Sequence, residues 1–231
     1  MAIVALLLGS IVAPLSTQIQ ERRFSETKRI LDEAREALIG FAIANARLPC
    51  PASGTSTGVE SISGGACTNP YNGFLPAITL GILPTDERGF AVDPWGNRIR
   101  YAVTASDANA FITTNGISNR FLVTTPNPDL HVCSTGQGPS SGPVCPIGPP
   151  DTTLTNSAPA VIYSIGANGL SGGTGPDEAE NPNPNSSNND RLFVSRPPRS
   201  EGTAAGAFDD IVVWLSPHVL YSRMVAAGKL P

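Results

Sequence analysis

The chain has 231 residues, a formal net charge of −4 and only 15% charged residues. This balance offers no basic surface for nucleic acid, so we expect no nucleic-acid partner. The length suits one domain with an appended helix, and the 23 glycines and 22 prolines indicate long irregular loops around a small core.

The first fifteen residues, MAIVALLLGSIVAPL, are apolar apart from one Ser and one Gly. As a helix they would rise about 22 Å, which falls short of the roughly 30 Å hydrocarbon core of a bilayer. No basic stretch precedes the run and no small-residue cleavage site follows it, so the pattern differs from that of a signal peptide. We predict that residues 1–15 are a truncated hydrophobic segment for membrane insertion and assembly.

Residues 16–47 continue as an amphipathic helix whose apolar side chains recur with a period of 3.6 residues. The apolar stripe comprises Ile30, Ala34, Ala37, Leu38 and Phe41. The opposite face is charged, and Leu48–Pro49 ends the pattern. We predict one helix over residues 1–47, bent at Pro14, with its last two-thirds covering a globular domain. The alternative is a signal-anchor helix joined to a separate core helix.

The cysteines are Cys50, Cys67, Cys133 and Cys145, and none forms a C-x-x-C pair. With only two histidines in the chain, a zinc site is disfavoured. Each successive cysteine pair brackets a loop rich in Gly, Pro, Ser and Thr, which is typical of disulfides formed in an oxidising compartment. Four cysteines allow three pairings, and we favour Cys50–Cys67 with Cys133–Cys145 because each bond closes a local loop.

The rest of the chain, residues 48–231, has the pattern of an α+β domain. We predict strands at residues 98–104, 121–125, 160–165 and 210–215. They would form a four-stranded antiparallel sheet, one face of which the amphipathic helix covers. Ser216 as N-cap, Pro217 at the first helical position and Gly228 at the end predict a short C-terminal helix. Residues 126–157 and 170–208 are expected to be long loops.

The sequence DPWGN at residues 93–97 predicts a turn. Pro94 fixes φ, Gly96 relaxes it, and the Asp93 side chain is suited to bond the backbone. The order of these features (an apolar segment with a proline, an amphipathic helix, DPWGN and the late DDIVVWL) resembles type IV pilins and type II secretion pseudopilins. The resemblance implies a structural role for Trp95, packed beneath the sheet.

The resemblance also implies partners and a location. It implies an inner-membrane protein with a periplasmic domain that assembles with other pilin or pseudopilin subunits into a periplasmic or extracellular filament. The family's basic leader, Gly cleavage site and Glu within the apolar run do not occur in these residues. We therefore expect an in-frame upstream extension, and prepilin peptidase is a partner only through such a start.

The sequence carries no catalytic signature. It lacks G-x-S-x-G, H-E-x-x-H and phosphate-loop patterns, so we do not expect an enzyme. SIGANG (residues 164–169) and the later FDDI (residues 208–211) resemble the calcium loop of the major pseudopilin. This resemblance implies calcium ligands at Asn168, Asp209 and Asp210, with Asn168 in place of an acid. The alternative is that the two aspartates only open a strand and solvate a loop.

These features favour a structural subunit of a type IV pilus or a type II secretion pseudopilus that polymerises through its N-terminal helix. The long loops and the two disulfides favour a minor or tip-type subunit. A membrane-tethered periplasmic binding module, an adhesin or a cargo receptor, is the alternative, because it would use the same loops. An envelope hydrolase is disfavoured by the lack of a nucleophile–base pair.

Overall fold

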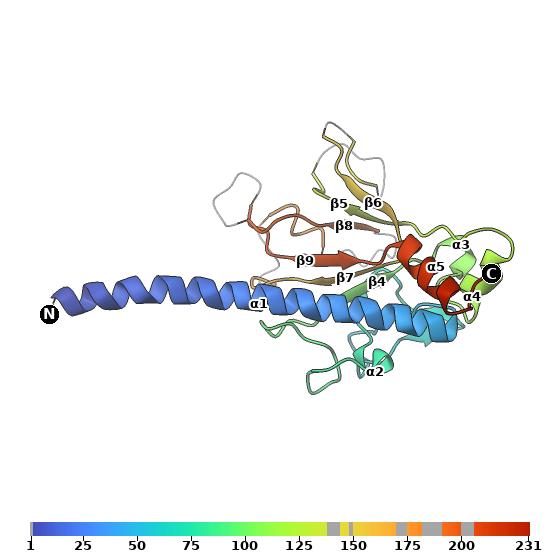
Figure 1. The fold of residues 1–231 in the computed structure, drawn as a ribbon, viewed down its shortest axis with the longest axis horizontal. Helices are drawn as coiled ribbons and strands as arrows, with labels where there is room; N and C mark the ends of the chain where they lie inside the picture. The colour runs from blue at the N-terminus through green and yellow to red at the C-terminus, as the bar shows by residue number, and fades with distance from the viewer. Residues whose placement is uncertain (1, 138–143, 148–149, 170–174, 182–190, 200–205) are drawn as a thin grey trace.

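A computed structural model describes residues 2–137, 144–147, 150–169, 175–181, 191–199 and 206–231, without the side chains of residues 2–16. The backbone is helical on both sides of Pro14, and the apolar contacts predicted for residues 1–15 lie outside these described side chains. The chain forms three layers: a long helix, a four-stranded sheet and a three-stranded sheet (Figure 1). This is the predicted α+β class with a long N-terminal helix. Across the described residues, no helix has both the length and the hydropathy needed to cross a membrane.

Helix α1 (Ala2–Asn45) is the first layer, and it ends close to the predicted position. Leu38 and Ala42 are fully buried on its inner face, as the 3.6-residue period predicts. Phe41, assigned to the same stripe, is only half-buried. Its ring lies under the guanidinium of Arg47, 5.0 Å from carbon to centroid, at the margin of the buried face.

The second layer is a sheet in which every neighbouring pair of strands is antiparallel. Its order is β3 (Gly73–Phe74), β4 (Arg100–Val103), β7 (Ala160–Ser164) and β9 (Ile211–Trp214). Three strands lie where the sequence predicts them, whereas β3 is an addition. Alternate side chains face opposite layers. Tyr101 and Ile162 pack against α1, and Ala102 and Tyr163 pack against the three-stranded sheet.

The strand predicted at residues 121–125 is wrong. Helix α4 (Gly116–Phe121) ends there, and the N–H of Val123 donates to the carbonyl oxygen of Arg120 at 3.0 Å. Leu122 and Val123 are 75% and 80% exposed. The run is rich in β-forming residues, but the fold gives it no neighbouring strand, and strand propensity depends on such packing.

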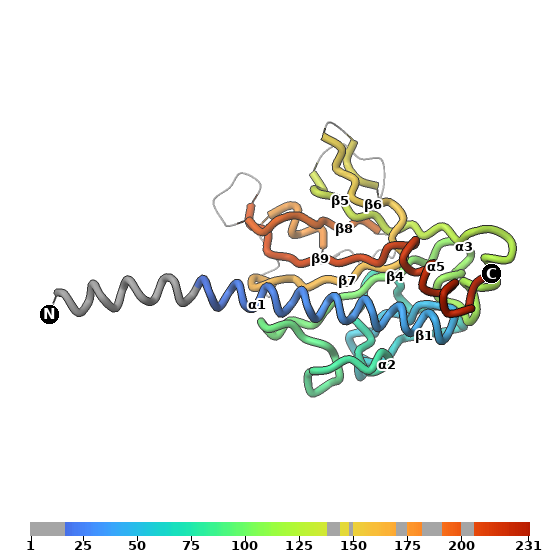
Figure 2. Tube along the Cα trace, viewed as in Figure 1, coloured from blue at the N-terminus to red at the C-terminus, as the bar shows by residue number. Residues whose placement is uncertain are grey.

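The third layer is a smaller sheet on the side of β7 and β9 away from α1 (Figure 2). Its order is β6 (Thr153–Ala158), β5 (Leu130–Cys133) and β8 (Leu192–Val194), with β5 and β8 parallel. These strands lie within residues 126–157 and 170–208, apart from the last residue of β6, so the expectation of loops there is wrong in part. Leu130, Val132 and Phe193 are buried against the four-stranded sheet, and this burial stabilises the strands.

The remaining elements are short. They are β1 (Ile62–Ser63), β2 (Ala66–Cys67), α2 (Ala77–Leu80), α3 (Ser106–Asn109) and α5 (Pro217–Ala226). Helix α5 confirms the predicted C-terminal helix, which starts after an extended Ser216. Leu220 and Met224 are fully buried in the core that α1 shares with the sheet, and Gly228 follows the helix with a φ of +67°.

Both predicted disulfides are present. Cys50 and Cys67 are bonded with their Cα atoms 5.1 Å apart, and Cys133 and Cys145 are bonded at 5.5 Å. The first bond ties the β1–β2 hairpin to the chain just after α1. The second joins Cys133 at the end of β5 to Cys145.

Candidate metal centre

Three carboxylates converge where β9 begins. Glu178, Asp209 and Asp210 each offer an oxygen, and these oxygens lie within 4.8 Å of one another. Asp209 and Asp210 directly precede β9, and Glu178 comes from the turn at residues 175–181. Glu178 and Asp210 are 1% and 3% exposed, so two of the three carboxylates are almost removed from solvent. These three residues are called the metal centre below.

One oxygen of each carboxylate accepts hydrogen bonds from neighbouring groups. Asp209 Oδ2 accepts hydrogen bonds from the backbone N–H groups of Ala167 and Asn168, at 2.8 and 3.2 Å. Glu178 Oε1 accepts from Asn168 Nδ2 at 2.7 Å and from the Asp209 N–H at 3.2 Å. Asp210 Oδ2 accepts from Asn181 Nδ2 at 2.8 Å. The carboxylates are therefore oriented before any ion binds.

The second oxygen of each carboxylate has no hydrogen-bond partner among the residues that the structure describes. These buried atoms are Glu178 Oε2, Asp209 Oδ1 and Asp210 Oδ1. Among the described residues, no lysine or arginine forms an ion pair with any of the three. Buried carboxylates without a partner are costly, and such groups are normally paired or coordinate a metal. The donor set therefore fits a cation held by oxygen atoms.

Burial and mutual repulsion show in the pKa values of the two aspartates. Burial, reinforced by the neighbouring Glu178 carboxyl, raises the pKa of Asp209 to about 6. Burial also raises the pKa of Asp210 well above its usual value, although the hydrogen bond from Asn181 opposes the shift. A bound cation would reverse both effects by favouring the charged carboxylates.

Gly166 brings the loop of residues 164–169 against Asp209. Its φ is +63°, and a Cβ at this position would lie 2.2 Å from Asp209 Oδ1. Only glycine permits this approach, because any larger residue would meet both a strained backbone and a steric overlap. Within SIGANG, Gly166 therefore shapes the metal centre as well as Asn168.

The structure brings together the residues predicted from sequence, with one addition. Asn168, Asp209 and Asp210 are neighbours, and Asn168 contributes a backbone N–H to Asp209 and a side-chain amide to Glu178. Glu178 lies in the stretch 170–208 with Asp177, Glu180 and Asp190, acids that could contribute a ligand but that no sequence pattern places. The structure selects Glu178, whereas Asp177 is bonded to Arg196 and to Thr135 instead.

The DPWGN turn is tied to the same loop. Asp93 Oδ1 accepts from the backbone N–H groups of Trp95 and Asn97, at 2.9 and 2.8 Å, as the turn prediction requires. Gly96 has a φ of +89°. Trp95 is half-buried against α1, where its ring meets that of Phe24 edge-on with centroids 6.4 Å apart. Pro94 lines a groove along the same part of α1.

No protein-family model, no curated protein and no solved structure matches this chain.

Proposed function

We propose that the chain is a structural subunit of a type IV pilus or type II secretion pseudopilus, assembled with other copies through the N-terminal part of α1. The observation that carries the proposal is the division of α1 (Figure 1). Its later turns form the core of the domain, whereas the first described side chains, residues 17–22, are all exposed. The helix therefore continues beyond the surface that it covers, and residues 1–15 ahead of this stretch are apolar.

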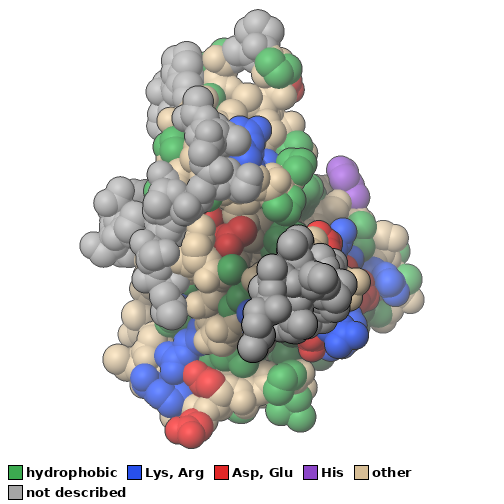
Figure 3. Space-filling model, turned by 90° about the vertical axis from the view of Figure 1, so that its left-hand side faces the viewer, with side chains coloured by type: hydrophobic (Ala, Val, Ile, Leu, Met, Phe, Trp, Pro, Cys, Tyr) green, Lys and Arg blue, Asp and Glu red, His purple; other side chains and the backbone are tan. Residues whose placement is uncertain are grey.

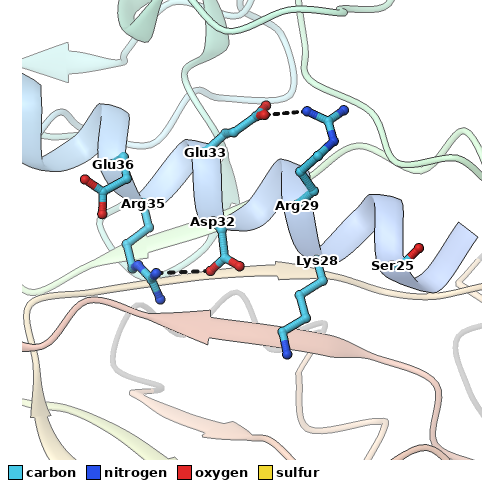
Figure 4. Close-up of a pocket in the computed structure, with 7 residues that line it drawn as sticks. All are labelled: Ser25, Lys28, Arg29, Asp32, Glu33, Arg35 and Glu36. Carbon is cyan, nitrogen blue, oxygen red and sulfur yellow. Dashed lines mark hydrogen bonds and ion pairs between the residues drawn. The ribbon is translucent and has the colours of Figure 1, made fainter.

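The outer face of α1 also supports packing between copies. A shallow groove of about 620 Å³ runs along this face. It is lined by Ser25, Lys28, Arg29, Asp32, Glu33, Arg35 and Glu36 (Figure 4). Arg29 pairs with Glu33 and Arg35 with Asp32, so charges of both signs are presented side by side. Figure 3 looks onto the end of the molecule that lies on the left in Figure 1, and it shows charged side chains of both signs there. Such a mixed surface suits a protein neighbour better than a polyanion.

The metal centre supports a structural ion in this subunit, and we propose calcium. Calcium prefers six to eight oxygen ligands and accepts flexible loops, which matches an all-oxygen donor set drawn from two separate segments. Glu178, Asp209 and Asp210 would hold the ion. Binding would tie the turn at residues 175–181 to the start of β9 and so fix part of the insertion between β7 and β9.

The assembly proposal is tested with Leu7→Lys in the full chain. Burying a leucine side chain in lipid or against another copy stabilises by roughly 1.5–3 kcal/mol, and a lysine there would oppose both environments. A matched control is Ile78→Lys, which places the same charge at a side chain that is 49% exposed on α2. We expect wild type and the control to enter membranes and filaments, and Leu7→Lys to be lost from both.

The same assay distinguishes a filament subunit from the main alternative, a binding module. A membrane-tethered binding module would enter membranes through residues 1–15 but would remain monomeric there. Cross-linking of the membrane fraction distinguishes the two, since a filament subunit gives a ladder of copies. Normal assembly of the Leu7→Lys variant would refute the proposal.

A further inference from the structure

A crevice of about 570 Å³ lies between α1 and the loops around the metal centre. It is lined by Gln20, Glu21, Phe24, Trp95, Ala167, Pro198 and Asp209. One wall therefore belongs to the first packed turns of α1, and the opposite wall includes a residue of the metal centre. The residues of both walls lie outside the strands of the four-stranded sheet.

A continuous chain of hydrogen bonds crosses from the metal centre to the DPWGN turn. Asp209 holds the loop through the N–H of Ala167, and the neighbouring Gly166 carbonyl accepts from Asn97 Nδ2 at 2.7 Å. The N–H of Gly166 donates to Ser164 Oγ at 3.2 Å. Ser164 Oγ in turn donates to Asp93 Oδ2 at 2.6 Å. Asp93, Asn97, Ser164 and Gly166 are all buried, so water competes little for these bonds.

The turn then reaches α1 through Trp95. The backbone N–H of Trp95 donates to Asp93 Oδ1 at 2.9 Å, which fixes the start of its side chain. Its indole Nε1 donates to Gln20 Oε1 at 3.3 Å, and its ring meets Phe24 edge-on. These contacts lie where α1 leaves the domain, next to the exposed residues 17–22.

We propose that the metal centre and the first packed turns of α1 are energetically coupled, so that calcium binding determines how firmly Trp95 is seated against the helix. The inference rests on the calcium centre proposed above. Without the ion, the negative charges of these carboxylates repel one another across less than 4.8 Å, which favours displacement of Asp209, the least buried of the three. The loop is hydrogen-bonded to Asp209 through the N–H groups of Ala167 and Asn168, so a displacement of Asp209 moves the loop. The bond from Asn97 to the Gly166 carbonyl then carries the movement to the turn.

Coupling of this kind is reciprocal. If calcium binding strengthens the packing of Trp95 against α1 by some factor, that packing strengthens calcium binding by the same factor. Loss of the α1 contact should therefore weaken calcium binding, although Phe24 does not belong to the metal centre. In an assembled subunit, calcium would then stiffen the junction from which the N-terminal part of α1 projects.

The first experiment follows Trp95 in the full chain in detergent. The chain has two tryptophans, so Trp214→Phe leaves Trp95 as the only one. Adding calcium chloride should change the emission of Trp95 in this background. Adding Asp210→Asn should abolish the change, because it removes a charge of the metal centre. Asn97→Ala should retain calcium binding by calorimetry but lose most of the emission change.

The second experiment compares two half-buried phenylalanines of α1. Phe24→Ala removes the contact with Trp95, whereas Phe41→Ala removes a ring at the far end of the helix. We expect Phe24→Ala to weaken calcium binding about fivefold, at the lower end of measured couplings, and Phe41→Ala to leave it unchanged. Equal affinities in the two variants, or no emission change on binding, would overturn the inference.

Failure here is distinguishable from failure of the assembly proposal. A full chain that binds no calcium at millimolar concentration overturns the coupling together with the calcium centre. The comparison of Leu7→Lys with Ile78→Lys is still decisive for the filament, since it measures membrane entry and assembly rather than metal binding.

Discussion

At the scale of single residues, the metal centre owes its character to an asymmetry within each carboxylate. One oxygen of Glu178, Asp209 and Asp210 is fixed by a hydrogen bond, and the other has none within the described part of the chain. A purely structural carboxylate would have both oxygens satisfied, as in Asp93, whose two oxygens accept three hydrogen bonds. The difference is what points to an ion rather than to loop solvation.

Calcium should therefore stabilise the folded chain. At a calcium concentration of one hundred times Kd, linkage gives about 2.7 kcal/mol, which corresponds to a rise in Tm of roughly 5–10 °C for a chain of this size. Asp210→Asn should abolish the rise. Asp177→Asn is the control, because Asp177 is equally buried but bonded to Arg196, so this variant should be less stable yet keep the calcium effect. The check is differential scanning fluorimetry with calcium and with chelator; an equal rise in both variants would exclude the site.

The raised pKa of Asp209 makes a second prediction, for chelated protein. Since the folded-state pKa is about 6 and the unfolded one is near 3.9, the folded state binds the proton more tightly. The contribution to stability is fully present below about pH 4 and is lost as the pH rises through about 6. Asp209→Asn lacks this charge, so it should gain stability relative to wild type at pH 7.5 and lose that gain toward pH 4. Denaturant unfolding of the two proteins at both pH values measures this, and a gain independent of pH would contradict it.

How far the site could be predicted depends on which segment a residue comes from. Asp209 and Asp210 directly precede a clear strand pattern, so their position at the start of a strand follows from the sequence. Glu178 lies in a Gly- and Asn-rich stretch without periodicity, and its approach to Asp209 depends on tertiary packing. The bond from Asn181 to the carbonyl oxygen of Val194 in β8 is one such contact, and nothing local encodes it.

At the scale of elements, the predictable parts are those with strong local patterns. Helix α1 has the 3.6-residue period over many turns, and α5 has a start, a buried face and a glycine stop. Strand β3, by contrast, is two residues long and includes Gly73, and β8 is three residues long. Such short strands are defined by their neighbours, so the sequence alone did not reveal them. Residues 121–125 are the converse case: their composition is typical of a strand, but the fold places no strand beside them, so they do not form one.

The Cys133–Cys145 disulfide should matter mainly to the third layer. It joins the end of β5 to a loop, and both sulfurs lie with Phe208 and Val194 in a small core of their own. Replacing both cysteines by alanine should cost about 3 kcal/mol, because the unfolded chain regains the entropy of an open loop. Guanidinium unfolding measures the loss. Non-reducing peptide mapping of wild type is the companion check, and free thiols or a crossed pairing would contradict the assignment.

At the scale of the whole molecule, the filament proposal assigns the two ends of α1 to different environments, and a truncation tests this division. The buried positions of α1 begin at Thr27, with Phe24 half-buried against Trp95, so a chain that starts at Phe24 keeps every buried side chain of the helix among those described. Such a chain loses the Arg23 carbonyl, which accepts from the Thr27 hydroxyl, and the bond from Trp95 to Gln20. It loses the apolar residues 1–15 and the exposed residues 17–22. We expect this shortened chain to be a monomer in solution with the circular dichroism spectrum of an intact α+β domain. Its unfolding free energy should lie within about 1 kcal/mol of that of the full chain in detergent, since exposed positions contribute little. Sedimentation and denaturant unfolding test both points. A truncated chain that unfolds would mean that the first residues belong to the core, and the division of α1 on which the filament proposal stands would then be mistaken.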